Sequence, residues 1–203
     1  MSEAAAQAPA TDLTARAAED NPFFTAGILG AARQHLGDAR VTVAEITNAA
    51  GQTIGLAPIR PTRLGRVVPA MAVWVHPHGP LGTPLLDAGA IDEAAAGLLA
   101  AMDGGRPGRA ILEFPYLPLA GPVADALRRQ AGLAGRPIAV LAAHRRAKLE
   151  RTGTDPTAFL QTISTKKRRE LTRQWRRLGD LGAVTVEHIS DPAQHADTLE
   201  DFF

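Results

Sequence analysis

The chain has 203 residues, 45% of them hydrophobic, a length that predicts one complete core and part of a second. Its 22 lysines and arginines nearly balance 21 acids, and the net charge of +1 excludes a polycation. The absence of cysteine excludes disulfides, thiolate metal sites and a cysteine nucleophile. No window reaches the ~18 consecutive apolar residues of a membrane span.

Residues 1–20 are rich in alanine and carry acids and bases, with no apolar stretch that would make a signal peptide. We expect them to form a disordered tail of a cytoplasmic protein. Three Asn-Pro or Asp-Pro pairs then predict helix starts, because the first side chain caps backbone N–H groups and proline suits the first helical position. These pairs are Asn21-Pro22, Asp155-Pro156 and Asp191-Pro192.

The first helix is predicted to run to about Leu36, where Gly37 stops it. The β-rich runs 40–47 and 53–60 flank NAAGQ and predict a hairpin. The remaining predicted elements of this part are a strand at 67–75, a loop rich in proline and glycine at 76–90, a helix at 91–102, a strand at 109–114, a helix from Gly121-Pro122 and a strand at 137–143.

A charged connector, residues 144–156, precedes a basic helix predicted from about Thr157 to Leu178. One face of this helix is apolar and is expected to be buried; its residues are Leu160, Ile163, Leu171, Trp175 and Leu178. A strand at 183–189 and a helix from Asp191-Pro192 follow. That helix carries Phe202 and Phe203 with no stop signal, so we expect the chain to be the beginning of a longer protein.

Three motifs make the element order more specific: NPFF from Asn21, WVHPHGPLGTPLLD over 74–87, and FLQTISTKKRRELTRQWRRLGDLGAVTVEHI over 159–189. Together they resemble the bacterial GNAT-type acetyltransferases associated with cellulose biosynthesis, which carry two GNAT-like halves in tandem. The resemblance implies an α/β fold with a mixed sheet. It also implies an N-terminal GNAT-like domain at 21–150, a connector with the basic helix at 151–182, and the start of a second GNAT-like domain at 183–203.

By this resemblance the full enzyme would move an acetyl or similar acyl group from coenzyme A to an amine or hydroxyl acceptor. The acetyl-CoA site is expected in the second half, outside this chain. A GNAT domain holds the pyrophosphate at a helix N-terminus after a Q/R-x-x-G-x-G/A turn. The one match, RQAGLA at 129–134, closes a helix instead of opening one, and we interpret it as chance. The loop before Ile91 lacks the pattern. The first turn of the helix carries Asp92 and Glu93, with Asp87 upstream, and these carboxylates compete with a bound phosphate.

The loop at 74–87 supplies candidate groove residues, namely Trp74, His76, His78, Gly82 and Pro84. A rigid packing loop is the interpretation we favour, a wall of an acceptor groove is the second, and a metal held by His76 and His78 is the third. No other cluster supports a metal. Tyr116 is either a proton donor for acyl transfer or a packed ring. The sequence identifies no catalytic residue.

The basic helix supplies a candidate site for an anion or substrate: Lys166, Lys167, Arg169, Arg173, Arg176 and Arg177. A solvated charged face is one interpretation. Recognition of CoA phosphates or a carboxylate in a cleft between the two halves is another, since the arginine fork suits such groups. Binding of nucleic acid or an anionic membrane is disfavoured, because no aromatic stacking platform accompanies the run. We assign no catalysis to Ser164 or Thr165.

Three functions remain open from the sequence. The first is the N-terminal part of an acyltransferase, with a small-molecule or saccharide acceptor and the second GNAT-like half of the same polypeptide as partners. The second is a non-catalytic module that binds an anionic partner through its basic helix. The third is a relative of the tRNA-dependent aminoacyl transferases that build peptidoglycan bridges.

Overall fold

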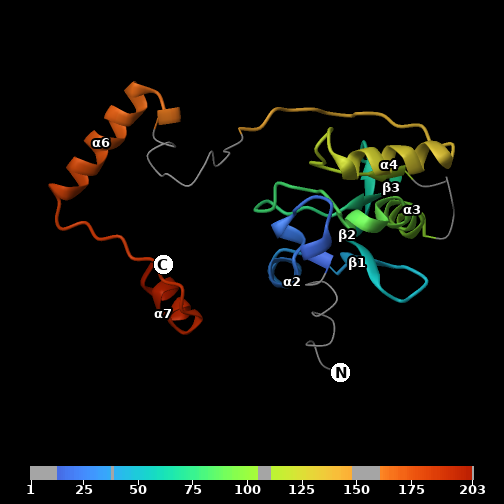
Figure 1. The fold of residues 1–203 in the computed structure, drawn as a ribbon, viewed down its shortest axis with the longest axis horizontal. Coiled ribbons are helices and arrows are strands. Elements are labelled where there is room, and N and C mark those ends of the chain that lie inside the picture. Colours follow the sequence, from blue (N-terminus) through green and yellow to red (C-terminus); the bar gives the residue numbers. More distant parts are fainter. Residues whose placement is uncertain (1–12, 38, 105–110, 148–160, 203) are drawn as a thin grey trace. The chain divides into compact units, whose positions relative to one another are not determined.

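The computed structural model describes residues 13–37, 39–104, 111–147 and 161–202 (Figure 1). The chain divides into two compact units, residues 1–141 and residues 142–203, here called unit 1 and unit 2. The predicted boundary at residue 150 lies among residues 148–160, outside the described part. In the part of the chain that the structure describes, unit 1 holds the sheet and unit 2 holds two helices.

Unit 1 is built on an open mixed sheet. Strands β1 (Thr42–Thr47), β2 (Thr53–Leu64) and β3 (Val68–Val73) form an antiparallel meander. Strand β5 (Ile111–Glu113) then pairs with β3 in parallel, and the short strand β4 (Leu85–Leu86) pairs with β2. Parallel pairing of β3 and β5 requires a crossover connection, which a helix provides. The mixed α/β class predicted from the sequence is therefore confirmed.

The predicted hairpin at NAAGQ is also confirmed. The side-chain oxygen of Asn48 accepts hydrogen bonds from the backbone N–H groups of Ala50 (3.1 Å) and Gln52 (3.0 Å). Gly51 has a φ of 76°, a conformation that glycine adopts at little cost. Local turn chemistry thus sets the register of β1 against β2.

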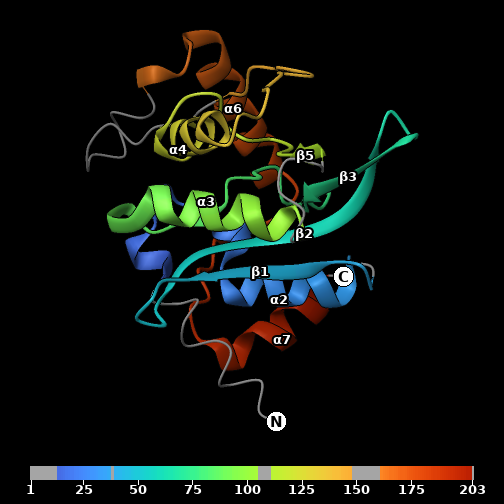
Figure 2. The same cartoon turned by 90° about the vertical axis from the view of Figure 1, so that its right-hand side faces the viewer.

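Helix α3 (Ile91–Met102) is the crossover between β3 and β5, and it lies on one face of β1 and β2, while α2 (Ala26–His35) lies on the other (Figure 2). Helix α4 (Pro122–Leu133) packs beside α3. One face of α3 is buried through Ala94, Ala95, Leu98, Leu99 and Met102. This helical spacing of small and large apolar residues is what the sequence predicts for a core-facing helix.

The first helix begins later than predicted. Residues Pro22–Phe24 form the 3₁₀ helix η1, and Thr25 then interrupts it with an extended backbone, so that α2 begins at Ala26. Asn21 does cap the segment, because its Oδ1 accepts from the N–H of Phe23 at 3.1 Å. The Asn-Pro pair therefore marks a helix start, but that helix is only one turn long.

Part of the expected tail belongs to the fold. Residues 13–16 are helical and the Leu13 side chain is fully buried. The N–H of Ala18 donates to the Leu86 carbonyl at 2.8 Å, and Arg16 forms an ion pair with Asp87. Residues 13–20 thus belong to the packed structure of unit 1, while residues 1–12 lie outside the described part. Leu13 is the apolar signal for this packing, and a single leucine in an alanine-rich run is a weak one.

Two predicted strands are wrong. Residues 137–143 and 183–189 form no regular element and pair with no described strand, and their apolar side chains are exposed, including Leu141 at 69% and Val186 at 81%. Their β-branched residues give the expected propensity. A strand, however, needs a partner edge for its backbone hydrogen bonds and a surface for its side chains, and neither is present among the described residues.

Unit 2 contains α6 (Thr165–Gly179) and α7 (Pro192–Phe202). The basic helix begins at Thr165 because Ser164 caps it, with Oγ accepting from the N–H of Lys167 at 3.3 Å. Its predicted start at Thr157 and the pair Asp155-Pro156 lie outside the described residues. The predicted start of α7 is confirmed, since Asp191 Oδ1 accepts from the N–H of Ala193 at 3.0 Å. Within the described ranges, each helix is too short or too polar to cross a bilayer.

Asn21 has a second role that joins distant parts of unit 1. Its side chain is almost fully buried, at 1% exposure. Its Nδ2 donates to the carbonyl of Thr83 at 2.8 Å and to that of Leu81 at 3.3 Å. A buried carbonyl that loses its donor costs the full desolvation penalty. Asn21 therefore ties the beginning of the fold to the loop that precedes β4.

We expect Asn21→Ala to lower the free energy of unfolding by about 2–3 kcal/mol, because it removes the cap of η1 and leaves two loop carbonyls without their donor. Urea unfolding followed by circular dichroism measures the change. Asn48→Ala is the matched control: it removes an exposed turn cap and should cost only about 0.5–1 kcal/mol. Equal losses for the two variants would show that Asn21 acts only as a local cap.

Candidate functional site

The loop at 74–84 is closed by β2. The N–H of Trp74 donates to the Pro58 carbonyl at 2.8 Å, directly after β3 ends. Further along the same edge of β2, Leu85 pairs with Leu56, and the N–H of Asp87 donates to the Ile54 carbonyl at 2.8 Å. One strand edge thus holds both ends of the loop.

The middle of this loop meets the segment that follows β5. The N–H of Gly82 donates to the Tyr116 carbonyl at 3.3 Å. A Cβ atom at Gly82 would lie 2.0 Å from the Pro115 carbonyl oxygen, so only glycine allows this approach. Tyr116 itself has a φ of 55°, which is rare for a residue with a side chain. The loop and Tyr116 therefore meet where the parallel strands β3 and β5 end, the edge at which open α/β sheets bind ligands.

The Tyr116 ring is not part of the core, because 49% of the residue is exposed. The predicted alternative of a packed ring is therefore wrong. The strained backbone and the exposed phenol together keep Tyr116 as a candidate proton donor. Backbone strain of this kind is often found at functional sites.

His76 is a buried residue of this loop. It is 8% exposed, and its ring centroid lies 5.5 Å from that of Trp74 and 6.2 Å from that of Phe23. Neither ring nitrogen has a hydrogen-bond partner in the described part of the chain. Burial lowers the pKa of His76 below its ordinary value of 6.5, and the nearby His78 lowers it further. The imidazole is thus held in its neutral form.

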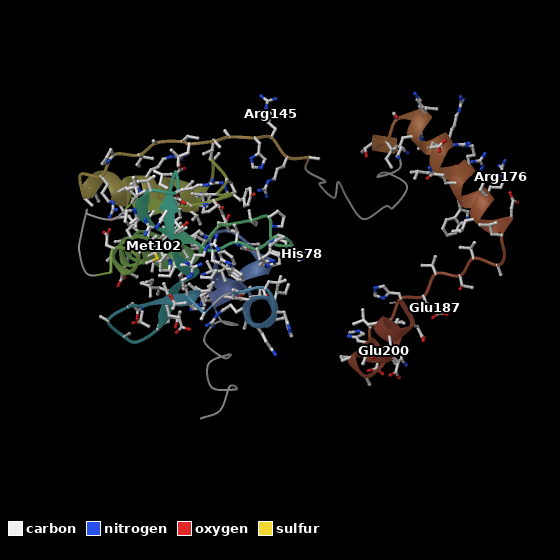
Figure 3. The ribbon with its side chains drawn as sticks, turned by 180° about the vertical axis from the view of Figure 1, so that it is seen from behind. His78, Met102, Arg145, Arg176, Glu187 and Glu200 are labelled. Carbon is white, nitrogen blue, oxygen red and sulfur yellow. The ribbon has the colours of Figure 1, made fainter. Side chains whose placement is uncertain are left out.

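The other predicted loop residues divide into buried and exposed. Trp74, Gly82 and Pro84 are buried, and His78 is exposed at the surface of unit 1 (Figure 3). The described residues contain no group of three histidines or acids that could hold a metal ion. The buried Thr83 hydroxyl also lacks a partner among them. The loop is thus mostly buried, and the ring nitrogens of His76 and the hydroxyl of Thr83 lack hydrogen-bond partners among the described residues. His78 is its exposed chemical group, and Tyr116 lies next to it.

Carboxylates occupy the N-terminal ends of helices α3 and α4. Near the start of α3, Asp92 accepts from Arg129 at 2.8 Å, and this hydrogen bond lowers the pKa of Asp92 below its ordinary value. At the start of α4, Glu19 Oε1 accepts from the N–H of Val123 at 3.2 Å. A helix N-terminus attracts anions, and here the chain supplies its own. No sequence signal pointed to Glu19, because its partner lies 104 residues away.

Helix α6 brings together three of the predicted basic residues. A shallow groove of about 530 Å³ lies along the helix and is lined by Thr165, Arg168, Arg169, Thr172, Arg173 and Arg176. Arg169, Arg173 and Arg176 were predicted for this site, while Arg168 was missed. Lys166, Lys167 and Arg177 are on α6 but do not line the groove.

One arginine of the groove is partly neutralised. Arg173 donates to both oxygens of Glu170, at 3.0 Å and 2.7 Å, which lowers the pKa of Glu170 and raises that of Arg173. Both groups are at the surface, so the pair adds little stability. Its main effect is to leave Arg168, Arg169 and Arg176 as the principal charges of the groove.

The apolar face of α6 is exposed in the described structure. Leu171, Trp175 and Leu178 are 41%, 58% and 49% exposed. Ile163 is half-buried, and Leu160 lies outside the described residues. The predicted burial of this face is therefore not seen in the part of the chain that is described.

Comparison with known proteins gave no relatives: no family model, no curated protein and no solved structure matches the chain.

We expect the buried neutral His76 to make unit 1 sensitive to acid. The unfolded chain takes up a proton near the ordinary pKa of 6.5, while the folded chain resists it, so stability is complete above that pH and is lost as the pH falls below it. Urea unfolding between about pH 7.5 and about pH 5 should show a smaller loss for His76→Phe than for the parent chain. His35→Phe, on the exposed face of α2, should keep the parent's pH dependence. An unchanged dependence in His76→Phe would contradict this account.

Proposed function

We propose that the chain is the N-terminal part of a GNAT-type acyltransferase, which transfers an acetyl or similar acyl group from coenzyme A to an amine or hydroxyl acceptor. The proposal is supported by the order of the elements in unit 1. Three antiparallel strands, a crossover helix, a parallel strand and a second helix follow one another as in a GNAT-like half. Fold alone does not define an activity, so the site must carry the argument.

The observation that carries the proposal is the meeting of the 74–84 loop with Tyr116 at the end of β3 and β5. Gly82 is bonded to the Tyr116 carbonyl there, and the phenol is half exposed. A group transfer from a thioester needs a proton acceptor for the attacking amine and a donor for the leaving thiolate. His78 and Tyr116 are the exposed groups of that kind beside this edge. In this proposal they form one wall of the acceptor site.

The acyl donor site lies in the second GNAT-like half in this proposal. Asp92 and Glu19 stand at the N-termini of α3 and α4, where a pyrophosphate would otherwise bind. A bound phosphate would have to displace these carboxylates or stand beside them, and both cost free energy. Unit 1 would then contribute the acceptor wall and the following half would contribute the coenzyme.

We expect the 203-residue chain to show no binding of acetyl-CoA in calorimetry, and the longer polypeptide encoded by its gene to bind it and to release coenzyme A in the presence of an amine acceptor. The chain has no cysteine, so a thiol reagent detects released coenzyme A without background from this part of the protein. Tyr116→Phe in the longer polypeptide should lower kcat by about 10²-fold with little change in acetyl-CoA binding. A gene that stops at Phe203, or a longer product that binds no acyl-CoA, would refute the proposal.

A second candidate function is an anion-binding module, favoured by the arginine groove of α6. Four guanidinium groups, one of them partly offset by the Glu170 carboxylate, fit carboxylate or phosphate groups on an extended polyanion. Such binding would not require chemistry in unit 1.

For this candidate we expect Arg168→Gln/Arg169→Gln/Arg176→Gln to weaken binding to heparin about tenfold or more at low salt and to flatten its salt dependence. Lys166→Gln/Lys167→Gln/Arg177→Gln is the matched control, since it removes the same charge from residues outside the groove. Equal weakening by the two sets would assign the binding to net charge alone. Fluorescence anisotropy with labelled heparin measures both.

A further inference from the structure

The β2–β3 hairpin extends well beyond the rest of the sheet (Figure 2). Pairing of β1 with β2 ends at Thr42 and Ile59, whereas pairing of β2 with β3 continues to Leu64 and Val68. On the other side, β5 reaches only to Ala70. Residues 61–69 are therefore a two-stranded ribbon with no neighbour on either side among the described strands.

This ribbon is basic in a protein that is nearly neutral. Residues 60–70 contain three arginines and no acid. With Arg40, which precedes β1, they line a shallow groove of about 650 Å³ together with backbone and small side chains; its lining residues are Arg40, Arg60, Pro61, Thr62, Arg63, Arg66, Pro69 and Ala70. Among the described residues, Arg60, Arg63 and Arg66 form no ion pair with a carboxylate. The charge of these three arginines is thus not offset there.

Two exposed valines follow the turn at the end of the ribbon. Val67 is 71% exposed and Val68 is 46% exposed. They stand next to Arg66, and the Arg63 guanidinium donates to the Val67 carbonyl at 3.3 Å. Exposed valines beside several arginines are the pattern of a segment that enters the headgroup region of a bilayer while its cations contact lipid phosphates.

The turn itself has an unfavourable residue. Gly65 and Arg66 have φ values of 57° and 67°, and the N–H of Val67 donates to the Leu64 carbonyl at 3.2 Å. Such a hairpin turn with two positive φ values favours glycine or asparagine at both central positions. An arginine there is a cost to the fold that places a cation at the tip. Strain of this kind points to a role in binding.

We propose that the β2–β3 hairpin docks unit 1 on an anionic lipid surface, with Val67 and Val68 in the headgroup layer and Arg40, Arg60, Arg63 and Arg66 on lipid phosphates. Charge complementarity selects an anionic surface, and the exposed valines select a bilayer over a soluble anion, because a free phosphate or a nucleic-acid backbone offers them no apolar contact. This inference is independent of the proposed acyl transfer.

The experiment measures binding of the full chain to vesicles of phosphatidylcholine with and without phosphatidylglycerol, by sedimentation at low and physiological ionic strength. We expect binding only to the anionic vesicles and weakening with salt. Arg60→Gln/Arg63→Gln/Arg66→Gln should weaken it by about a hundredfold, at about fivefold per arginine. The matched control Lys166→Gln/Lys167→Gln/Arg177→Gln removes the same charge from α6, from residues outside its groove, and should bind vesicles as the parent chain does. A hairpin variant that binds within twofold of the parent overturns the proposal.

Two further variants separate binding from folding. Arg66→Asn relieves the backbone strain of the turn, so its urea midpoint should not fall, while its vesicle binding should fall about fivefold. Val67→Thr/Val68→Thr keeps the β-branched shape and should also weaken binding, because it removes apolar contact. If Arg66→Asn binds vesicles as well as the parent chain, the arginine has no part in docking and the proposal fails.

The position of the hairpin is read directly with an environment-sensitive dye on a single cysteine, since the chain has none of its own. A dye at Val67→Cys should gain intensity and shift to the blue on anionic vesicles, and a dye at Ala50→Cys, in the exposed turn between β1 and β2, should not. A silent dye at position 67 on vesicle-bound protein overturns the proposal. The same holds if the dye responds to inorganic phosphate or to duplex DNA but not to vesicles.

Discussion

The organisation of unit 1 depends on the hydrogen-bonding capacity of one edge of β2. This strand of twelve residues is longer than any of its neighbours, and its backbone groups are satisfied by β3 over its second half and by β4 and Asp87 over its first half. The loop at 74–84 therefore begins and ends at that same edge of β2. The same length makes the far end of β2 leave the sheet with β3 alone. The candidate acceptor wall and the arginine hairpin are thus two outcomes of one long strand.

Side chains from the beginning of the chain then hold this arrangement in place. Asn21 donates to two carbonyls of the loop, Arg16 pairs with Asp87 beside β4, and Glu19 caps α4. Each of these groups is polar and is satisfied by a residue at least 60 positions away. The N-terminal segment therefore holds the loop, the end of β4 and the start of α4 together near the edge where β3 and β5 end. The chemistry proposed for that edge requires such fixed geometry, because acyl transfer depends on the placement of donor and acceptor groups.

Local sequence signals predicted the elements whose causes are local. The bounds of α3 and the starts of α4 and α7 follow from apolar spacing and from Gly121-Pro122 and Asp191-Pro192. The absence of strands at 137–143 and 183–189 could not be predicted in this way. β-propensity depends on the residue itself, whereas strand formation also depends on whether a neighbouring strand is available for pairing. The loop motif directed attention to His78, and Tyr116 was a candidate because it follows a predicted strand, but the hydrogen bond that joins Tyr116 to Gly82 has no local signal. The arginines of β2 were not predicted as a binding site, because their spacing indicated only a strand.

All side chains of the buried core of unit 1 lie between Leu13 and Ala131, and the last buried ion pair joins Arg136 to Asp103. Nothing after residue 136 is needed to complete that core among the described residues. During synthesis, the nascent chain can therefore close unit 1 while the connector and the basic helix are still within the ribosome. Folding would then proceed from the N-terminus. The exposed apolar segment 137–143 would emerge after unit 1 has formed, which limits its association with strands that are not yet paired.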